Sequence, residues 1–508
     1  MTALIYVMFK LKLLSFKGFF RLIAAIWQDG INLMALLRIA ERSYGDKIAI
    51  TDEQETLTYR QLMSQSERLS CVLTEHYGLG PGKKAGILCR NHAAMAKTIF
   101  AVSAAGADLY LLNAEMSAAQ FGQLAEEHRF DVIIHDEDAA SLIAMSSSHR
   151  ESIFSYHDSL PAIHTLAQEQ IPLRPKRRRM SAGRLMLLTG GTTGKAKRVP
   201  HKPSLFHYLP PFAAMLSRMR LAEYRTAYIA TPIYHGYGIG VLLLGVALGQ
   251  KVVLTRKFDA ANACGLIRQH QVEFVSVVPL MVHKMLRANA EGLKPVACIA
   301  SGGAELNPKL VEEVSSALGD VLYNLYGTSE GGLMAIATPQ DLKDSPNTIG
   351  RRIRGVPLSV LDAGKKIART GEIGQLCLRG KRRGAGRWIE TGDLGFVNER
   401  GYYFLCGRTD DRIVSAGENV YPIEVERMLC LHPAIEDVAV VGIPDEMFGQ
   451  RLKAVVQLYP GAELSEAELM AWLRPRAARF QMPKEVVFTE QIIYTHAGKR
   501  DKKQLKTY

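Results

Sequence analysis

The sequence predicts an α/β protein with a large N-terminal domain of layered sheets and helices and a small, mobile α+β domain at the C-terminus. Apolar runs of strand length alternate with helical patterns through about the first four hundred residues, which is typical of layers built on largely parallel sheets. After about Asp410 the elements become shorter, and roughly one hundred residues remain, enough for a small separate domain. The 508 residues can therefore form at least two domains around a large core.

The individual elements can be placed on the chain. Predicted strands cover 84–89, 107–112, 131–135, 226–231, 251–255, 274–278 and 296–301. Predicted helices cover 58–76, 117–128, 260–270 and 308–318. Near the C-terminus we expect short strands at 438–441 and 454–458 and a helix at 466–478. The expected organisation is an N-terminal segment 1–30, a large domain 31–409 and a lid domain 410–508.

The charge balance is basic. The chain has 63 Lys and Arg against 50 Asp and Glu, a formal charge of +13. This excess suits anionic ligands such as nucleotides, or an acidic membrane surface. The alternative is a basic protein without such a partner.

The seven cysteines are scattered singly, without a C-x-x-C pair. This pattern predicts buried, reduced thiols in a cytoplasmic protein rather than disulfides or a metal site. The cysteines are Cys71, Cys89, Cys264, Cys298, Cys377, Cys406 and Cys430.

The N-terminal segment 1–28 is apolar and basic at the same time. No uncharged apolar run reaches the roughly 20 residues of a spanning helix, and no charged region precedes an apolar core as in a signal peptide. Lys10, Lys17 and Arg21 fall near one face of a helix. Two interpretations stay open: a helix that makes peripheral contact with a membrane, and a helix packed on the body of the protein.

A second concentration of basic residues lies at 174–179 and contains a proline. We interpret it as a solvated connector, because no aromatic platform for base stacking accompanies it. The sequence therefore predicts no nucleic-acid partner.

The most informative motif follows the apolar run Leu185–Leu188. Glycine lets a backbone approach a ligand and turn its N–H groups toward it. Threonine hydroxyls and lysine ammonium groups add donors for anionic oxygens. The spacing differs from the common G-x-x-x-x-G-K-[ST] loop, and the alternative for the motif alone is a flexible surface loop. The sequence at this point is Thr189-Gly190-Gly191-Thr192-Thr193-Gly194-Lys195-Ala196-Lys197.

Five further clusters follow along the chain, each of which alone is more often an ordinary turn. Small residues at a strand end suit ligands that bind beyond the carboxyl ends of parallel strands. Hydroxyls suit phosphate, a lone carboxylate suits a largely hydrated Mg²⁺, and a carboxylate in a tight turn can accept both hydroxyls of a ribose. The clusters are Tyr234–Gly236, Ala300–Ala304, Tyr326–Glu330, Glu390–Asp393, and Gly407–Arg412 with Gly417 after it.

In this order, the motifs resemble the adenylate-forming superfamily of acyl-CoA synthetases, luciferases and peptide-synthetase adenylation domains. The resemblance runs from about Asp46 to Leu505 and includes Gly498-Lys499. Segments 88–92 and 111–113 look most like bacterial fatty-acyl-CoA synthetases. The chain departs from the family's Ser-Gly-Thr-Thr-Gly-x-Pro-Lys-Gly loop at Gly190, Ala196 and Arg198. It also has 494–497 where the family has arginine-threonine-proline.

The resemblance implies an ATP site. The phosphates would be held by the glycine-rich loop, through Thr189, Gly190, Gly191, Thr192, Thr193, Gly194 and Lys197. The adenine would be lined by Gly302, Gly303 and Asn324 and stacked by Tyr326. The ribose hydroxyls would be bound by Asp393, with Arg408 beside it.

The same resemblance implies the reacting groups. His235 would border the acyl carboxylate and the α-phosphate, Thr328 would bind the α-phosphate, and Glu330 would hold Mg²⁺. Lys499 would bridge the carboxylate and the α-phosphate during adenylation. Asp410 matches the hinge of the lid, and Gly417 would border the tunnel for the pantetheine arm of CoA. ATP, Mg²⁺ and CoA are therefore the expected cofactors and co-substrates.

The expected function is that of an AMP-forming fatty-acid–CoA ligase acting on a medium- or long-chain acid. The acyl pocket would lie near 234–239, 277–280 and 301–303, where no charge is present to recognise an amino group. The run Gly236–Gly245 fits either a channel for an alkyl chain or a tightly packed buried helix. Alternatives are an aryl-acid–CoA ligase, an enzyme that loads a carrier protein, and a weakly active homologue.

Overall fold

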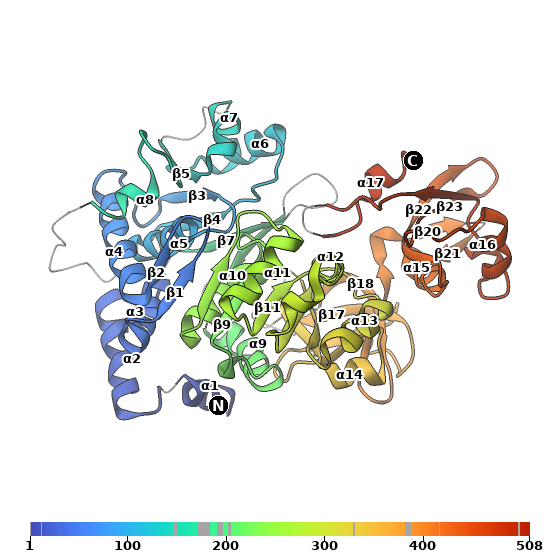
Figure 1. Ribbon diagram of the computed structural model, residues 1–508, viewed down its shortest axis with the longest axis horizontal. Helices are drawn as coiled ribbons and strands as arrows, with labels where there is room; N and C mark the ends of the chain where they lie inside the picture. Colours follow the sequence, from blue (N-terminus) through green and yellow to red (C-terminus); the bar gives the residue numbers. More distant parts are fainter. Residues whose placement is uncertain are drawn as a thin grey trace. The chain divides into compact units, whose positions relative to one another are not determined.

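The computed structural model describes residues 2–11, 13–145, 151–169, 183–189, 197–201, 205–328, 331–380, 388–415, 417–495 and 498–508. The chain forms two compact units, coloured by sequence in Figure 1. The first unit consists of Met1–Val277, Met281–Ser301 and Val314–Tyr323, and the second of Val278–Leu280, Gly302–Glu313 and Asn324–Tyr508. Helices and strands are mixed in both units, which confirms the predicted α/β class. The predicted divisions at residues 31 and 410 stay predictions.

The first unit contains a six-stranded sheet in the order β6-β5-β3-β4-β7-β8. All neighbouring strands are parallel except β7 and β8, which form an antiparallel hairpin. Its inner strands are almost entirely buried and apolar, as expected for a sheet covered on both faces. The bounds are β3 Lys84–Leu88, β4 Asp108–Leu111, β5 Val132–His135, β6 Glu151–Phe154, β7 Leu185–Thr189 and β8 Lys197–His201.

A second run of strands in this unit has the order β12-β11-β9-β10-β1-β2. It is parallel apart from the β1–β2 hairpin. Each strand predicted in this region is present within a residue or two of its expected bounds. They are β1 Ile48–Thr51, β2 Thr56–Thr58, β9 Thr226–Ile229, β10 Lys251–Leu254, β11 Phe274–Val277 and β12 Cys298–Gly302.

Several helices begin at a residue whose side chain caps the helix, among them α3, α4, α5, α6 and α11. In α4, the Thr58 hydroxyl accepts from the Gln61 backbone N–H at 3.2 Å, and the Gln61 side chain accepts from the Thr58 N–H at 2.9 Å, a reciprocal box that satisfies two free donors. The helices up to residue 318 are α3 Leu33–Tyr44, α4 Tyr59–Glu75, α5 Ala93–Ala105, α6 Ala118–His128, α7 Ala140–Ala144, α8 Ile163–Leu166, α9 Leu205–Arg218, α10 Gly236–Leu248, α11 Ala260–His270, α12 Pro279–Asn289 and α13 Pro308–Leu318.

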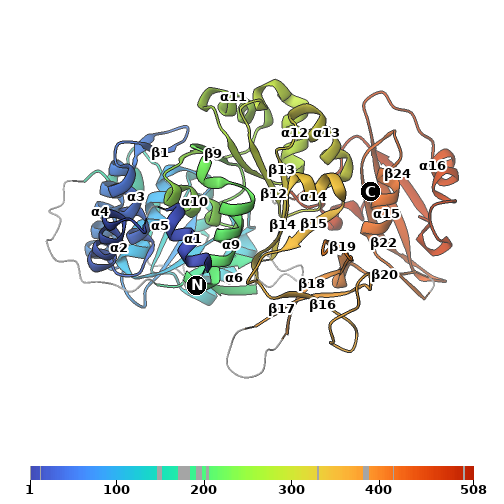
Figure 2. The same ribbon diagram turned by 90° about the horizontal axis from the view of Figure 1, so that it is seen from below.

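The N-terminal segment forms two helices rather than one. The first, α1 (Thr2–Lys10), lies along α9, and the second, α2 (Phe16–Asp29), lies along α3 (Figure 2). Ser15 starts α2 because its hydroxyl accepts from the Gly18 N–H at 3.1 Å. Among the described residues, no helix combines the length and the apolar character needed to cross a membrane.

The second unit contains an antiparallel run of strands in the order β16-β17-β18-β19-β15-β14-β13. Apolar side chains on one side of these strands form a core that includes Tyr326 and Leu376. The bounds are β13 Leu322–Thr328, β14 Gly332–Ala337, β15 Thr348–Arg352, β16 Leu358–Leu361, β17 Gly374–Arg379, β18 Trp388–Val397 and β19 Tyr403–Arg408, with α14 Pro339–Asp344 between β14 and β15.

The C-terminal part of this unit has its own sheet, β21-β20-β23-β22, with β24 parallel to β23. The strands predicted at 438–441 and 454–458 are present but longer than expected: β22 (Ile435–Asp445) and β23 (Gly449–Leu458) form one long hairpin, because their polar ends also pair along the ladder. Helix α16 (Glu466–Leu473) is shorter than predicted and ends two residues before Pro475. The remaining elements are β20 Ile413–Ser415, β21 Glu418–Val420, α15 Pro422–Cys430, β24 Glu485–Thr489 and α17 Lys502–Leu505.

Candidate active site

The glycine-rich motif joins the two strands of the β7–β8 hairpin. Thr189, the last residue of β7, is paired with Lys197, the first residue of β8. Because β7 is parallel to β4, Thr189 lies at the carboxyl edge of this sheet, where ligands bind in open α/β folds. The residues between them, including the predicted phosphate contacts Gly190, Gly191, Thr192, Thr193 and Gly194, lie outside the described residues.

His235 is the residue that precedes helix α10, and it is half-buried. Its ring meets the ring of Tyr234 edge-on, with centroids 4.6 Å apart. The segment before it is held by Asn91, whose amide donates to the carbonyls of Ile229 at 3.3 Å and Thr231 at 3.0 Å. The Asn91 amide oxygen accepts from the Ile233 N–H at 2.7 Å. A buried asparagine therefore fixes the backbone that carries His235, a role that the sequence analysis missed.

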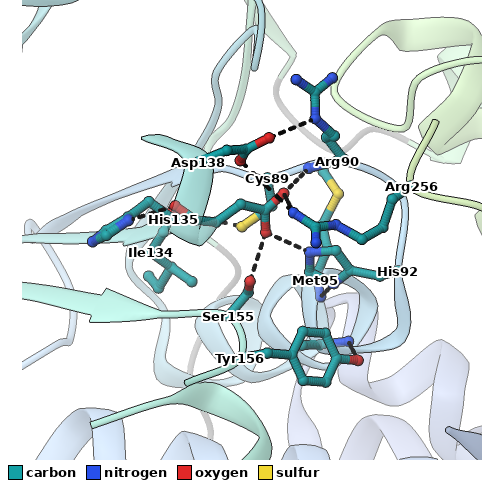
Figure 3. A network of polar contacts seen from close by, with 12 residues as sticks. Cys89, Arg90, His92, Met95, Ile134, His135, Asp138, Ser155, Tyr156 and Arg256 are labelled. Carbon is teal, nitrogen blue, oxygen red and sulfur yellow. Dashed lines mark hydrogen bonds and ion pairs between the residues drawn. The ribbon is translucent and has the colours of Figure 1, made fainter. Parts of the chain in front are cut away.

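A buried polar network includes Arg90 and His92, the two neighbours of Asn91 in the chain (Figure 3). His92 accepts from the Met95 N–H at 3.0 Å through Nδ1, so its proton is on Nε2 and is donated to Asp136 at 2.7 Å. Asp136 also accepts from the Arg90 N–H at 2.9 Å and from the Ser155 hydroxyl at 2.6 Å. Burial by itself would raise the pKa of the Asp136 carboxyl, but these bonds hold it well below its usual range.

This network includes a potential metal-ligand set. The ligand atoms of Cys89, His92 and Asp136 lie within 4.8 Å of one another. However, both ring nitrogens of His92 are engaged, and burial raises the pKa of the Cys89 thiol well above its usual value. A metal would need a free imidazole nitrogen and a thiolate. We therefore interpret the cluster as a structural network that holds residues 89–92 in place.

The end of β12 carries the small residues predicted to line an adenine. Gly303 has a φ of +84°, a conformation that favours glycine over any residue with a Cβ. In the first unit, the Tyr237 hydroxyl donates to the carbonyl of Ala300 at 2.7 Å. The hydroxyl of Ser301 is buried without a hydrogen-bond partner among the described residues. Gly302 and Gly303 follow directly in the chain, at the carboxyl edge of the sheet.

The second unit brings four predicted residues together. The Tyr326 hydroxyl donates to Asp393 Oδ2 at 2.7 Å. Asp393 is paired across the β18–β19 ladder with Arg408, whose Nη1 lies 3.5 Å from Asp393 Oδ1. Arg408 also donates to Asp410 Oδ1 at 2.8 Å. The predicted adenine-stacking ring, ribose carboxylate, flanking arginine and hinge residue thus form one hydrogen-bonded chain.

The Asp393 carboxylate is shielded from solvent, and this changes its acidity. Burial raises the pKa of Asp393, while the Tyr326 hydroxyl and the positive charges of Arg408 and Lys499 oppose that rise. Burial and the Asp393 charge raise the pKa of Tyr326 well above its usual value, so the phenol stays a donor. The turn before Asp393 needs a φ of +84° at Gly392. Each carboxylate oxygen has two lone pairs, so Asp393 can accept further donors besides Tyr326 and Arg408, as ribose recognition would require.

Other predicted residues on β13 have internal partners. Asn324 is buried, and its amide donates to the Thr348 carbonyl at 3.0 Å. The Thr328 hydroxyl accepts from the Gly331 N–H at 3.1 Å.

Glu330, the predicted Mg²⁺ ligand, lies outside the described residues. Gly417 lies in the exposed turn between β20 and β21 with a φ of +81°. The roles assigned to these residues stay predictions.

Lys499 is exposed in a turn between Tyr494 and Arg500, which form an isolated β-bridge. Arg500 attaches this turn to helix α15 and strand β22. Its guanidinium donates to Glu426 of α15 at 2.9 Å and to Asp437 of β22 at 2.9 Å. The Tyr494 hydroxyl also donates to Asp437. The sequence analysis missed Arg500, because its partners lie 74 and 63 residues away in the chain and no local pattern connects them.

Comparison with known proteins identifies the family of this chain. Residues 37–386 match the family model for AMP-binding enzymes, and residues 424–499 match the C-terminal domain of AMP-binding enzymes. The chain therefore belongs to the AMP-binding enzyme family, within the adenylate-forming superfamily, and is a ligase of the class that includes acyl- and aryl-CoA ligases.

Individual relatives are distant but similar over nearly their whole length. The 2-succinylbenzoate–CoA ligase of Bacillus pumilus is 26% identical over 91% of this chain and 95% of its own. The fatty acid–[acyl-carrier-protein] ligase ScoC of Streptomyces coeruleorubidus is 28% identical over 90% and 92%. The structure of the o-succinylbenzoate CoA synthetase of Bacillus subtilis with its acyl-adenylate has a TM-score of 0.78, 23% identity and coverage of 93% and 97%. This last likeness establishes the shared fold.

The position of Asp393 leads to a first prediction. We expect Asp393→Asn, which keeps an acceptor for the Tyr326 hydroxyl, to raise KM for ATP by about 10- to 100-fold, since a charged acceptor for the ribose is lost. The raised pKa of Asp393 means that the wild-type carboxylate protonates at a higher pH than an ordinary aspartate. The wild-type KM for ATP should therefore rise on acidification, and the rise should begin at a higher pH than titration of an ordinary aspartate would give.

Steady-state kinetics at several pH values check this prediction. Replacement of the exposed Glu399 by Gln removes one carboxylate at a distance from the site and serves as the control. The Asp393→Asn variant should have a KM that depends less on pH than the wild-type value. Equal values of KM for ATP in Asp393→Asn and in wild type would contradict a ribose-binding role.

Proposed function

We propose that this chain is an AMP-forming acid–CoA ligase that activates an aryl carboxylic acid. The observation that carries the proposal is its similarity to 2-succinylbenzoate–CoA ligase over 91% of the chain and 95% of the relative. The linked Tyr326, Asp393 and Arg408 supply the nucleotide end of such a site. The acid would be an organic carboxylate without an amino group, since the predicted acyl segments carry no charge to recognise one.

Packing of α10 favours an aryl acid over a long alkyl chain. The sequence left open whether residues 236–245 line a channel or form a packed helix. Helix α10 buries Val241, Leu242 and Leu244, which expose at most 3% of their surface, whereas Leu243 is half-buried and the glycines at 236 and 240 are exposed. Side chains with so little exposed surface do not line an open channel. A compact acid therefore agrees better with this part of the site than a long chain does.

The chemistry addresses a carboxylate that is a poor electrophile. Its oxygen would attack the α-phosphate of ATP, giving acyl-AMP and releasing pyrophosphate. The CoA thiol would then attack the acyl carbon, lose its proton and displace AMP, giving the thioester. Lys499 and Thr328 would bind the carboxylate and the α-phosphate in the first step, and His235 would border both, so that the reacting atoms are aligned and their charge is offset.

The proposed contacts with Mg²⁺ and with CoA each involve a single residue. Mg²⁺ held by Glu330 would neutralise charge on the phosphates when bound. Gly417, in its exposed turn, would border the pantetheine arm of CoA. Asp410 would serve as the hinge that withdraws Lys499 before the second step.

A second candidate is an enzyme that loads a fatty acid onto a carrier protein. The similarity to the ScoC ligase, 28% identical over 90% of this chain, favours it specifically. This candidate keeps the fatty-acid substrate predicted from the sequence and changes the acceptor from CoA to a protein-bound pantetheine.

A pyrophosphate-release screen separates these functions. The acids would be 2-succinylbenzoate, benzoate, anthranilate and unbranched aliphatic acids of increasing length, each with CoA, with a pantetheine-loaded carrier protein, and without acceptor. The proposal expects kcat/KM for the best aryl acid to exceed that for the best aliphatic acid at least about tenfold, with AMP release dependent on CoA. The reverse order, or dependence on the carrier protein alone, overturns it.

The same screen distinguishes a weakly active homologue. ATP binding measured by calorimetry, together with no acid-dependent pyrophosphate release, would identify a protein that binds nucleotide without turnover. Pyrophosphate release that depends on any one of the acids excludes a protein that binds nucleotide without turnover. The substituted loop positions Gly190, Ala196 and Arg198 can then be restored to the family residues to measure how much activity they cost.

A further inference from the structure

The N-terminal helices carry an unusual concentration of exposed apolar side chains. Of the 22 large apolar residues that are exposed in the described chain, ten lie between residues 5 and 31. Phe16 exposes 81% of its surface and Trp27 64%. Exposed apolar residues scattered singly need no explanation, but a contiguous patch marks an interaction site. The ten are Ile5, Phe9, Leu14, Phe16, Phe19, Phe20, Ile23, Ile26, Trp27 and Ile31.

Helix α2 is amphipathic in the opposite sense to an ordinary surface helix. It buries the small residues Gly18 and Ala25 together with Asp29, and this face packs on α3. The large apolar residues Phe16, Phe19, Phe20, Ile23, Ile26 and Trp27 are all exposed. At 100° per residue these six fall within an arc of about 120° on the side away from the buried face. A surface helix normally turns its apolar stripe toward the core, so the outward stripe of α2 requires a partner.

The charges around the stripe indicate which partner. The first 28 residues contain Lys10, Lys12, Lys17 and Arg21 and no acidic residue. On the α2 helix, Lys17 and Arg21 lie beside the apolar arc and not within it. Asp29, the first acidic residue, is buried and paired with Arg38. Arg21 is half-buried and also donates to the Ser43 hydroxyl at 3.2 Å. An apolar stripe whose neighbouring charges are all positive is complementary to a surface that is apolar inside and anionic at its rim.

We propose that α2, with the exposed side chains of α1, docks on the surface of a bilayer that contains anionic lipids. The apolar arc would enter the boundary between headgroups and acyl chains, and the cations would contact lipid phosphates. Trp27 would lie at the level of the headgroups, where tryptophan is enriched. The described helices are too short to span a bilayer, so the contact is peripheral. The proposal does not depend on which acid the enzyme activates.

Flotation of the full-length protein with lipid vesicles tests this proposal. Vesicles of phosphatidylcholine alone are compared with vesicles containing phosphatidylglycerol. The test variant is Phe16→Ser/Phe20→Ser/Trp27→Ser. The control is Leu160→Ser/Leu431→Ser/Met447→Ser, which removes three exposed apolar residues outside the N-terminal segment. We expect wild type and control to float with anionic vesicles, and the test variant to bind at least about 100-fold more weakly.

Two further measurements identify the docking contact. Lys17→Gln should weaken binding about fivefold on anionic vesicles and leave binding to neutral vesicles unchanged. In Trp388→Phe/Trp472→Phe, Trp27 is the one remaining tryptophan. Its emission should shift to the blue on vesicle addition and be quenched by brominated acyl chains.

Several outcomes overturn the proposal. One is equal flotation of the test and control variants, and another is no flotation of wild type. A third is a wild-type dimer, seen by sedimentation velocity without lipid, that the test variant alone loses, because a second copy of the chain would then be the occupant. Circular dichroism and pyrophosphate release at wild-type level in the test variant show that it is folded.

Discussion

Lys499→Ala is expected to slow formation of the acyl-adenylate at least about 100-fold while leaving thioester formation from supplied acyl-adenylate near the wild-type rate. The reason is that the first step brings a carboxylate against an α-phosphate, and a preorganised cation there lowers the barrier by several kcal/mol. In the second step a neutral thiol attacks a mixed anhydride, so a cation at that position contributes less. Lys499 is exposed on its turn, and its charge acts on Asp393 in the same unit.

The two half-reactions must be measured separately to test this expectation. Exchange of labelled pyrophosphate into ATP reports the first, and thioester formation from synthetic acyl-AMP reports the second. Lys503→Ala is the matched control, because Lys503 is an exposed lysine of the same tail. Loss of both half-reactions alike in Lys499→Ala, with Lys503→Ala unaffected, would contradict a role confined to adenylation.

Arg500→Met is expected to lower the free energy of unfolding of the C-terminal part by about 3–5 kcal/mol. Arg500 is the shared partner of the Glu426 and Asp437 carboxylates. Arg500 exposes 21% of its side chain, but Glu426 exposes only 7%, so removing the arginine leaves carboxylates uncompensated in a poorly solvated site. The same change frees the turn that carries Lys499, so adenylation should fall more than thioester formation does.

Differential scanning calorimetry and the two half-reaction assays check this second expectation. Arg500→Lys keeps the charge but loses the forked geometry, and should recover part of the stability. Arg474→Met alters an exposed arginine that directly follows helix α16 and is the control. If Arg500→Met melts like Arg474→Met, the network does not anchor the turn. If Arg500→Met is destabilised but both half-reactions fall equally, Arg500 stabilises the turn without positioning Lys499 for adenylation.

Much of the first unit was predictable because its strands are continuous apolar runs. Strands β3, β9 and β11 are buried on both faces, and apart from Lys84 at the start of β3 their residues are apolar, aromatic or small. Helix α11 was located to the residue because Asp259 caps its start. The long C-terminal hairpin was underestimated because the polar ends of β22 and β23 pair without an apolar signal.

Some residues of the candidate site were also predictable from the sequence, and others were not. Tyr326, Asp393, Arg408 and Asp410 were found as local motifs, and the structure joins them through side-chain bonds. Asn91 and Arg500 were missed, since each acts on backbone or carboxylates more than 60 residues away. An asparagine or an arginine looks the same in sequence whether it is solvated or shared among distant partners.

The sequence by itself determined the α/β class, the order of the nucleotide motifs and the basic, apolar character of the N-terminus, because each depends on residues adjacent in the chain. Only the tertiary structure decided which groups hold the site residues in place, that residues 236–248 form a helix with one buried side, and that α2 turns its apolar face outward. Burial and long-range hydrogen bonds depend on what packs against a residue, and that information is distributed over the whole fold.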